Sequence, residues 1–241
     1  MTTDISLLIV AFFISSFITS VTGMAGGILM FSSATSVLPI RSAIAIHGVV
    51  QAFSNLWRSW LLRKYIIWPM LLPFLIGSLI GALLTTVFIA DFITEQMALS
   101  ILIVLISYSI LNPKMIKELK ITNKQFSVVG VITSSLGLIA GAIDPLLAIF
   151  FMRDDLSKEQ IVATKSAMQF ICHSIKIPAF IYLGFDFKEN LTLITILTIS
   201  ATLGTFAGVR SLRKIPQNIF FNLMKIFLII SGLNIAYQLI F

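Results

Sequence analysis

Long apolar stretches alternate with short polar segments along this chain. A helix that crosses a membrane needs about 20 mostly apolar residues. By that measure the stretches predict an all-α protein with about eight helical segments in the membrane. They cover about residues 5–38, 43–62, 66–90, 95–111, 126–151, 159–182, 190–209 and 217–240.

Two of these segments are interrupted. The first carries Gly23-Met24-Ala25-Gly26-Gly27 in its middle, and the fifth carries Gly141-Ala142-Ile143-Asp144-Pro145 at the matching place. Glycine loosens a helix, and proline cannot donate the helical hydrogen bond. We therefore expect each of these two segments to break into two half-helices.

The pattern of residues 22–58 is repeated in residues 140–176. A shift of 118 positions takes Gly23 to Gly141 and keeps apolar residues on apolar ones. An internal duplication in a very hydrophobic chain is typical of transporters, whose substrate sites lie where the repeats meet. The same shift pairs four polar positions: His47 with Lys165, Gln51 with Gln169, Asn55 with His173, and Arg58 with Lys176.

Glycines also correspond later in the two halves, where Gly77 and Gly81 match Gly204 and Gly208. Glycines four residues apart let two helices approach closely in a membrane. The spacing therefore permits close helix packing in both halves.

Charges in the loops predict the topology. Arg63 and Lys64, and the four lysines within 112–124, favour the cytoplasmic side, whereas the acidic segment 91–95 favours the outside. In the second half the bias is reversed, because 183–190 is weakly acidic and 210–214 is basic. This indicates two inverted repeats, each with one re-entrant broken hairpin and three spanning helices. Eight plain spans with parallel repeats are the alternative.

The composition excludes a soluble protein. Hydrophobic residues make up 58% of the chain and charged residues only 11%, against about 25% in soluble domains. The mean hydropathy is +1.02. We expect a single integral membrane domain over 1–241, with repeat one at about 5–111, a joining loop at 112–124 and repeat two at about 126–241. The segment Met1–Asp4 has no Lys or Arg, so no signal peptide is predicted.

Several functions are not expected. The net charge of +7 fits cytoplasmic loops better than a nucleic-acid surface. Cys172 is the single cysteine, so no internal disulfide can form, and no Cys/His spacing indicates a metal site. We therefore predict no metal, no cofactor, no nucleic-acid partner and no catalytic residues. The partners expected are the lipid bilayer and a small inorganic or organic anion.

The breaks themselves predict an anion site. Unpaired N–H groups at the start of a half-helix, together with the helix dipole, attract negative charge. Two such starts that approach the membrane midplane would form one site between the repeats, with Pro145 in the first turn of the second half-helix. The predicted members are Gly23, Gly26, Gly27 and Gly141. The alternative is that the glycines only permit a kink or tight packing.

Each half also carries a polar stripe on its second helix. His47, Gln51, Asn55 and Arg58 are spaced by four, four and three residues, which places them on one helix face. Lys165, Gln169, His173 and Lys176 repeat that spacing. Residues that can ionise within a membrane are functional candidates by default, so the two stripes are predicted to line an anion path. Other interpretations remain open. Arg58 and Lys176 could extend to the membrane surface, and His47 and Lys165 could lie at the level of the lipid headgroups. Gln51 and Gln169 could form a hydrogen bond between helices.

Asp144 has several interpretations. An ionised carboxylate at the break would repel an anion. The residue could be neutral, could pair with Lys165 or Lys176, or could take part in proton coupling, because burial favours the neutral carboxyl. All of these alternatives stay open at the level of the sequence.

These motifs resemble the TauE/SafE family of sulfite-exporter-like membrane proteins over essentially the whole chain. The resemblance lies in the first glycine-rich break, in Leu38-Pro39, and in the alanine-rich helix with Ala43, Ala45 and His47. This chain departs from the family pattern at three places: Ala25 stands where glycine is common, Ile143-Asp144-Pro145 replaces the second set of glycines, and Ser157 takes the place of Pro39.

The resemblance implies movement of sulfite, sulfonates or related anions across a prokaryotic inner membrane. Together with the anion site, it predicts a multi-pass secondary transporter that works by alternating access. Ion gradients would drive it, because the sequence has no nucleotide-binding motif. An anion channel and an intramembrane enzyme are the rival hypotheses. The sequence leaves open a homo-oligomer and coupling to protons or to another ion.

Overall fold

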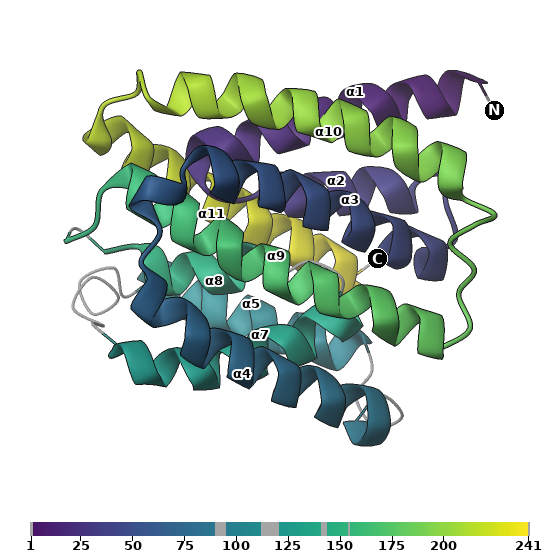
Figure 1. Cartoon of the computed structure of the whole chain (residues 1–241), viewed down its shortest axis with the longest axis horizontal. Helices are drawn as coiled ribbons and strands as arrows, with labels where there is room; N and C mark the ends of the chain where they lie inside the picture. Colours follow the sequence, from purple (N-terminus) through teal and green to yellow (C-terminus); the bar gives the residue numbers. More distant parts are fainter. Residues whose placement is uncertain (1, 90–94, 112–120, 141–143, 154, 241) are drawn as a thin grey trace.

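The structure, a computed structural model, describes residues 2–89, 95–111, 121–140, 144–153 and 155–240 (Figure 1). Within these ranges every regular element is helical, as the sequence predicts. The α-helices are α1 (Thr2–Thr22), α2 (Gly26–Thr35), α3 (Ile40–Leu61), α4 (Trp68–Leu84), α5 (Glu95–Leu111), α7 (Phe126–Ala140), α8 (Asp144–Phe151), α9 (Lys158–Tyr182), α10 (Leu191–Leu212) and α11 (Gln217–Ile240). Three short helical turns accompany them: η1 (Arg63–Tyr65), η2 (Thr85–Ile89) and η3 (Asn123–Gln125).

Among the described residues, four helices are long and apolar enough to cross a membrane. They are α1, α4 with its extension η2, α10 and α11. Helices α3 and α9 carry the predicted polar stripes, which are buried inside the protein. Because of these polar residues, a criterion based on hydropathy alone does not select the two helices as membrane spans. Only part of the predicted set of eight membrane segments is therefore visible from length and hydropathy.

The first interruption lies where the glycines predict it. Helix α1 ends at Thr22, and α2 starts at Gly26. Between them, Gly23 has φ 74° and Ala25 has φ 73°, a backbone conformation that side chains with a Cβ seldom adopt. A methyl group on Gly26 would overlap the Ser15 carbonyl of α1, so α1 and α2 approach closely just beyond the break.

The second interruption falls between the end of α7 at Ala140 and the start of α8 at Asp144. Pro145 lies in the first turn of α8, as predicted. Gly141 lies outside the described residues, as does most of the joining loop 112–124.

Helices α3 and α9 pack against each other in opposite directions. Arg41 at the start of α3 donates a hydrogen bond to the carbonyl of Leu183, which follows the end of α9. Beyond the other end of α3, the Ile67 N–H donates to Thr164 Oγ1 near the start of α9, at 3.0 Å. The two polar stripes therefore face each other along one interface.

The other large contacts between helices join one half of the chain to the other. Helix α1 packs along α10 and α4 packs along α7, each pair running in the same direction (Figure 1). Methyl groups on the four paired glycines would each overlap a backbone carbonyl of the neighbouring helix. These overlaps are Gly77 with Ser127, Gly81 with Val131, Gly204 with Phe13, and Gly208 with Phe17. The predicted close packing is therefore confirmed in both pairs.

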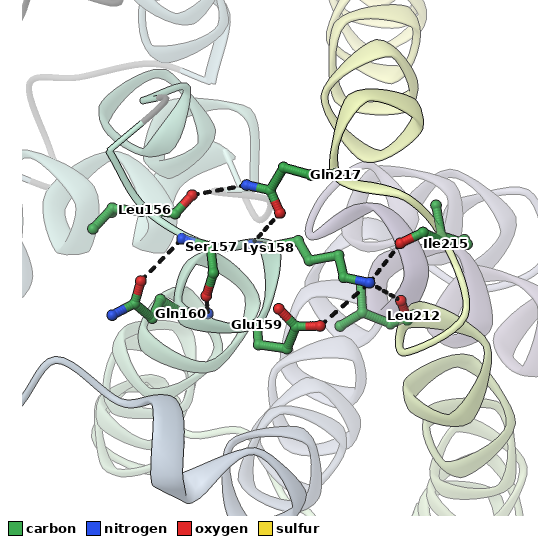
Figure 2. Close-up of polar contacts among 8 residues, drawn as sticks. All are labelled: Leu156, Ser157, Lys158, Glu159, Gln160, Leu212, Ile215 and Gln217. Carbon is green, nitrogen blue, oxygen red and sulfur yellow. Dashed lines mark hydrogen bonds and ion pairs between the residues drawn. The ribbon is translucent and has the colours of Figure 1, made fainter.

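A buried lysine ties the start of α9 to the turn between α10 and α11 (Figure 2). Lys158 Nζ donates to the carbonyl of Leu212, at 2.8 Å, and to that of Ile215. The Gln217 side chain accepts from the Lys158 N–H at 3.0 Å and donates to the Leu156 carbonyl at 2.9 Å. A cation at the end of α10 compensates carbonyls that have no helical partner.

Ser157 explains one departure of the sequence from the family pattern. It is the N-cap of α9, where its hydroxyl accepts from the Gln160 N–H and the Gln160 side chain accepts from the Ser157 N–H (Figure 2). Pro39 holds the N-cap position of α3. Two chemically different residues thus begin equivalent helices, because a capping box stabilises a helix start as an extended proline does.

Candidate functional site

The starts of the two half-helices meet inside the protein. The Gly27 N–H in the first turn of α2 donates to Asp144 Oδ2 at 2.7 Å, and Asp144 opens α8. Gln169 on α9 donates through Nε2 to Asp144 Oδ1. Asp144 is only 2% exposed. A carboxylate of the chain itself therefore occupies the N-terminus of α2, where the sequence predicts amide groups that are free to bind an anion.

The carbonyl groups of the first break are bound from α3 and α9. His47 Nε2 lies 3.1 Å from the Gly27 carbonyl oxygen, and Lys165 Nζ donates to the Gly23 carbonyl oxygen. His47 and Lys165 are equivalent in the duplication, and both bind the same break. Both side chains are buried inside the protein.

Arg58 is fully buried and held by neutral groups. Its Nε donates to Ser20 Oγ at 2.8 Å, and NH1 donates to Asn55 Oδ1 at 2.6 Å. NH2 donates to Ser54 Oγ at 3.0 Å and lies 3.5 Å from Ser16 Oγ. These bonds hold the guanidinium inside the protein, so Arg58 does not extend to the membrane surface.

The predicted stripe on α3 forms a continuous polar chain. Asn55 Nδ2 donates to Gln51 Oε1 at 3.2 Å, and Gln51 Nε2 lies 3.5 Å from His47 Nε2. Since Asn55 binds Arg58 and His47 binds Gly27, the chain leads from the arginine to the first break.

Two histidines from the facing stripes meet edge to face. The His47 and His173 rings have centroids 5.5 Å apart at an angle of 82°, and Phe31 of α2 packs on His47 at 5.7 Å. Nδ1 of each histidine is buried without a hydrogen-bond partner among the described residues. Buried polar atoms are nearly always bonded, so this pair can accept a small polar ligand or water.

Positive charge exceeds negative charge in this buried cluster. Arg58, Lys165 and Lys176 all interact electrostatically with Asp144, and all four are at most 2% exposed. Among the other buried cations of the described chain, Arg153 pairs with Asp155 and Lys158 with Glu159. One carboxylate thus faces three cations. Because an uncompensated buried charge is very unfavourable, the cluster favours a further anion.

The cluster is closed to solvent in this conformation. Its polar side chains are no more than 2% exposed. Three surface grooves were found elsewhere, with volumes of about 530, 390 and 350 Å³. The largest is lined by Leu61, Phe206, Ala207, Val209, Arg210 and Arg213, and none of the three is lined by a predicted site residue.

The structure gathers nearly every site residue that the sequence singles out into one buried region. The described members are Gly23, Gly26, Gly27, His47, Gln51, Asn55, Arg58, Asp144, Lys165, Gln169, His173 and Lys176. The hydroxyl groups of Ser16, Ser20, Ser54 and Thr205 around Arg58 were not predicted. Their signal was a spacing of four residues between Ser16 and Ser20, and between Ser54 and Arg58, within apolar helices.

Comparisons with known proteins give one family match. The model of the family described as "Sulfite exporter TauE/SafE" matches residues 7–235. A search of curated proteins found no match, and a search of solved structures found none either.

Proposed function

The chain belongs to the sulfite exporter TauE/SafE family, and from this premise we propose that it is a secondary transporter for a small sulfur-containing anion. Sulfite and organosulfonates are the substrates that the family and the site together favour. The family and the four apolar helices identify an integral membrane protein. We place it, as a multi-pass protein, in the inner membrane of a prokaryotic cell.

The buried excess of positive charge is the observation that carries this proposal. Arg58, Lys165 and Lys176 outnumber Asp144 where α2 and α8 begin. A bound monoanion would lower that excess, and the N-terminus of α2 would add its dipole. A sulfite or sulfonate group offers three oxygens to the donors around it.

We assign the donors by their freedom to move. Gly26 and Gly27 supply amide groups, and Gln51, Gln169, Asn55 and His173 supply side-chain hydrogen bonds. Lys165 brings a mobile ammonium group to the first break. Arg58 provides a fixed positive charge, because its donors already bind Ser16, Ser20, Ser54 and Asn55.

Alternating access is supported by the directions of the helices. Equivalent helices α3 and α9 run antiparallel, and each half contributes its first helix to a pair with the other half. Such exchange is what two inverted repeats produce. In this proposal the described conformation is the closed one, and rocking of the repeats opens the site to one end at a time.

The test is uptake of labelled anions into vesicles that contain the purified protein. Sulfite, sulfoacetate, sulfate and lactate are compared under an imposed pH gradient. We expect saturable uptake of the sulfur-containing anions, reduced about tenfold or more in Gln51→Ala and Gln169→Ala. Gln96→Ala, on the exposed start of α5, is the matched control and retains wild-type uptake.

Two results would contradict the proposal. Uptake that rises linearly with anion concentration would indicate a channel instead of a carrier. Unchanged uptake in both glutamine variants would place the substrate elsewhere.

A further inference from the structure

We propose that Asp144 is a built-in competitor of the substrate: its carboxylate fills the anion site when the site is empty, and the substrate enters by displacing it. This inference rests on the proposed transport of an anion. It adds the residue that the substrate must displace.

The hydrogen bonds of Asp144 carry the argument. Its Oδ2 accepts from the Gly27 N–H at 2.7 Å, and its Oδ1 accepts from Gln169 Nε2. Gly27 and Gln169 are donors that the substrate needs. Each N–H can serve one acceptor well, so a sulfonate oxygen and the Asp144 carboxylate cannot both hold these donors.

The packing leaves no room for both anions side by side. A methyl group built on Gly27 would collide with the Asp144 carboxylate and would lie 3.1 Å from Gln51 Nε2. The carboxylate therefore lies directly against the backbone of α2. Substrate can reach that backbone only after the Asp144 side chain has rotated away.

The surrounding cations attract whichever anion occupies the site. Lys165 and Lys176 interact electrostatically with Asp144 from α9, and Arg58 does so from α3. A negatively charged substrate that takes the place of the carboxylate therefore gains the same three cations.

Displacement exchanges one acceptor for another. The Asp144 carboxylate gives up the hydrogen bonds from Gly27 and Gln169, and oxygen atoms of the substrate accept them instead. Removal of the Asp144 charge removes the competitor and therefore strengthens anion binding.

The test uses ethanesulfonate, the anion of a strong acid. Calorimetric titrations of the purified full-length protein measure its affinity for this anion in the wild-type protein and in two variants.

The matched variants are Asp144→Asn and Asp155→Asn. Asparagine is nearly the same size as aspartate and lacks the competing charge. We expect Asp144→Asn to bind ethanesulfonate about tenfold or more tighter than the wild-type protein does. Asp155 pairs with Arg153 outside the site, so Asp155→Asn retains the wild-type affinity.

An Asp144→Asn protein that binds ethanesulfonate no more tightly than the wild-type protein would overturn the inference and leave the proposed function standing. If none of the three proteins binds ethanesulfonate, the proposed function fails, and this inference fails with it.

Discussion

At the scale of single residues, the duplication keeps positions but changes their chemistry. His47 and Lys165 are equivalent, and each binds a carbonyl group of the first break. Asp144 has no acidic counterpart, because Gly26 stands at the matching position of the first half. The sequence predicted which residues matter through their spacing. The Gly27–Asp144 bond could not be predicted, because it depends on how two breaks far apart in the chain face each other.

Arg58 gives a sharp prediction at this scale. A lysine keeps the charge but has three donors on one atom, so it cannot reach Ser20, Ser54 and Asn55 together as the guanidinium does. We expect Arg58→Lys to destabilise the protein by about 2 kcal/mol, the cost of leaving buried acceptors without a donor. Thermal unfolding in detergent measures the change.

Arg63→Lys is the control for this substitution. The Arg63 side chain is exposed and donates to the Trp60 carbonyl, so its replacement should leave the unfolding midpoint within experimental error. If Arg58→Lys and the wild-type protein had equal unfolding midpoints, a positive charge alone would be enough to bind the surrounding hydroxyl groups. The planar guanidinium would then not be required.

At the scale of elements, glycine sets both the breaks and the packing. The sequence located the first break to within a few residues, because Gly23, Gly26 and Gly27 cluster there. Ala25 adopts φ 73°, so the fold enforces a backbone conformation that its side chain disfavours. The polar helices α3 and α9 show why hydropathy alone identifies four spans. They pack on each other and bury their polar faces.

The paired glycines give the prediction at this scale. In Gly77→Ala or Gly204→Ala, the added methyl group would overlap a carbonyl of the neighbouring helix, so α4 and α7, or α1 and α10, must separate. We expect each variant to lose about 1 to 3 kcal/mol of stability, as overpacked positions do. Thermal unfolding again measures it.

Gly48→Ala is the matched control in a helix. Its methyl group would meet the Lys176 side chain at 3.7 Å, an ordinary contact, so little stability should be lost. If Gly77→Ala and Gly204→Ala were as stable as Gly48→Ala, the helix pairs would not depend on their close approach.

At the scale of the whole molecule, the directions of the helices and the loop charges agree. The turn between α3 and α4, the segment before α7 and the turn between α10 and α11 lie at one end of the molecule, on the left in Figure 1. These segments contain Arg63, Lys64, Lys124, Arg213 and Lys214. The turn between α9 and α10 lies at the opposite end. Loop charge predicted this distribution because it reflects membrane insertion, whereas the closed conformation of the site depends on packing that no loop charge encodes.

Topology is therefore the prediction at this scale. Cysteines are introduced singly at Lys64, Lys214 and Lys188 in a chain that carries Cys172→Ser. In intact cells, a membrane-impermeant thiol reagent should label only the cysteine at Lys188, because the basic end faces the cytoplasm. Labelling at Lys214 without labelling at Lys64 would contradict the inverted arrangement.

The central claim is that a sulfur oxyanion rests where the half-helices α2 and α8 begin. Crystals of the protein grown with selenite, the selenium analogue of sulfite, test it through the anomalous scattering of selenium. The account predicts the strongest selenium peak beside the Gly27 N–H, with a selenite oxygen in position to accept its hydrogen bond and the Asp144 carboxylate turned away from it. A peak confined to the outer groove beside Arg210 and Arg213, with the Gly27–Asp144 bond intact, would contradict it.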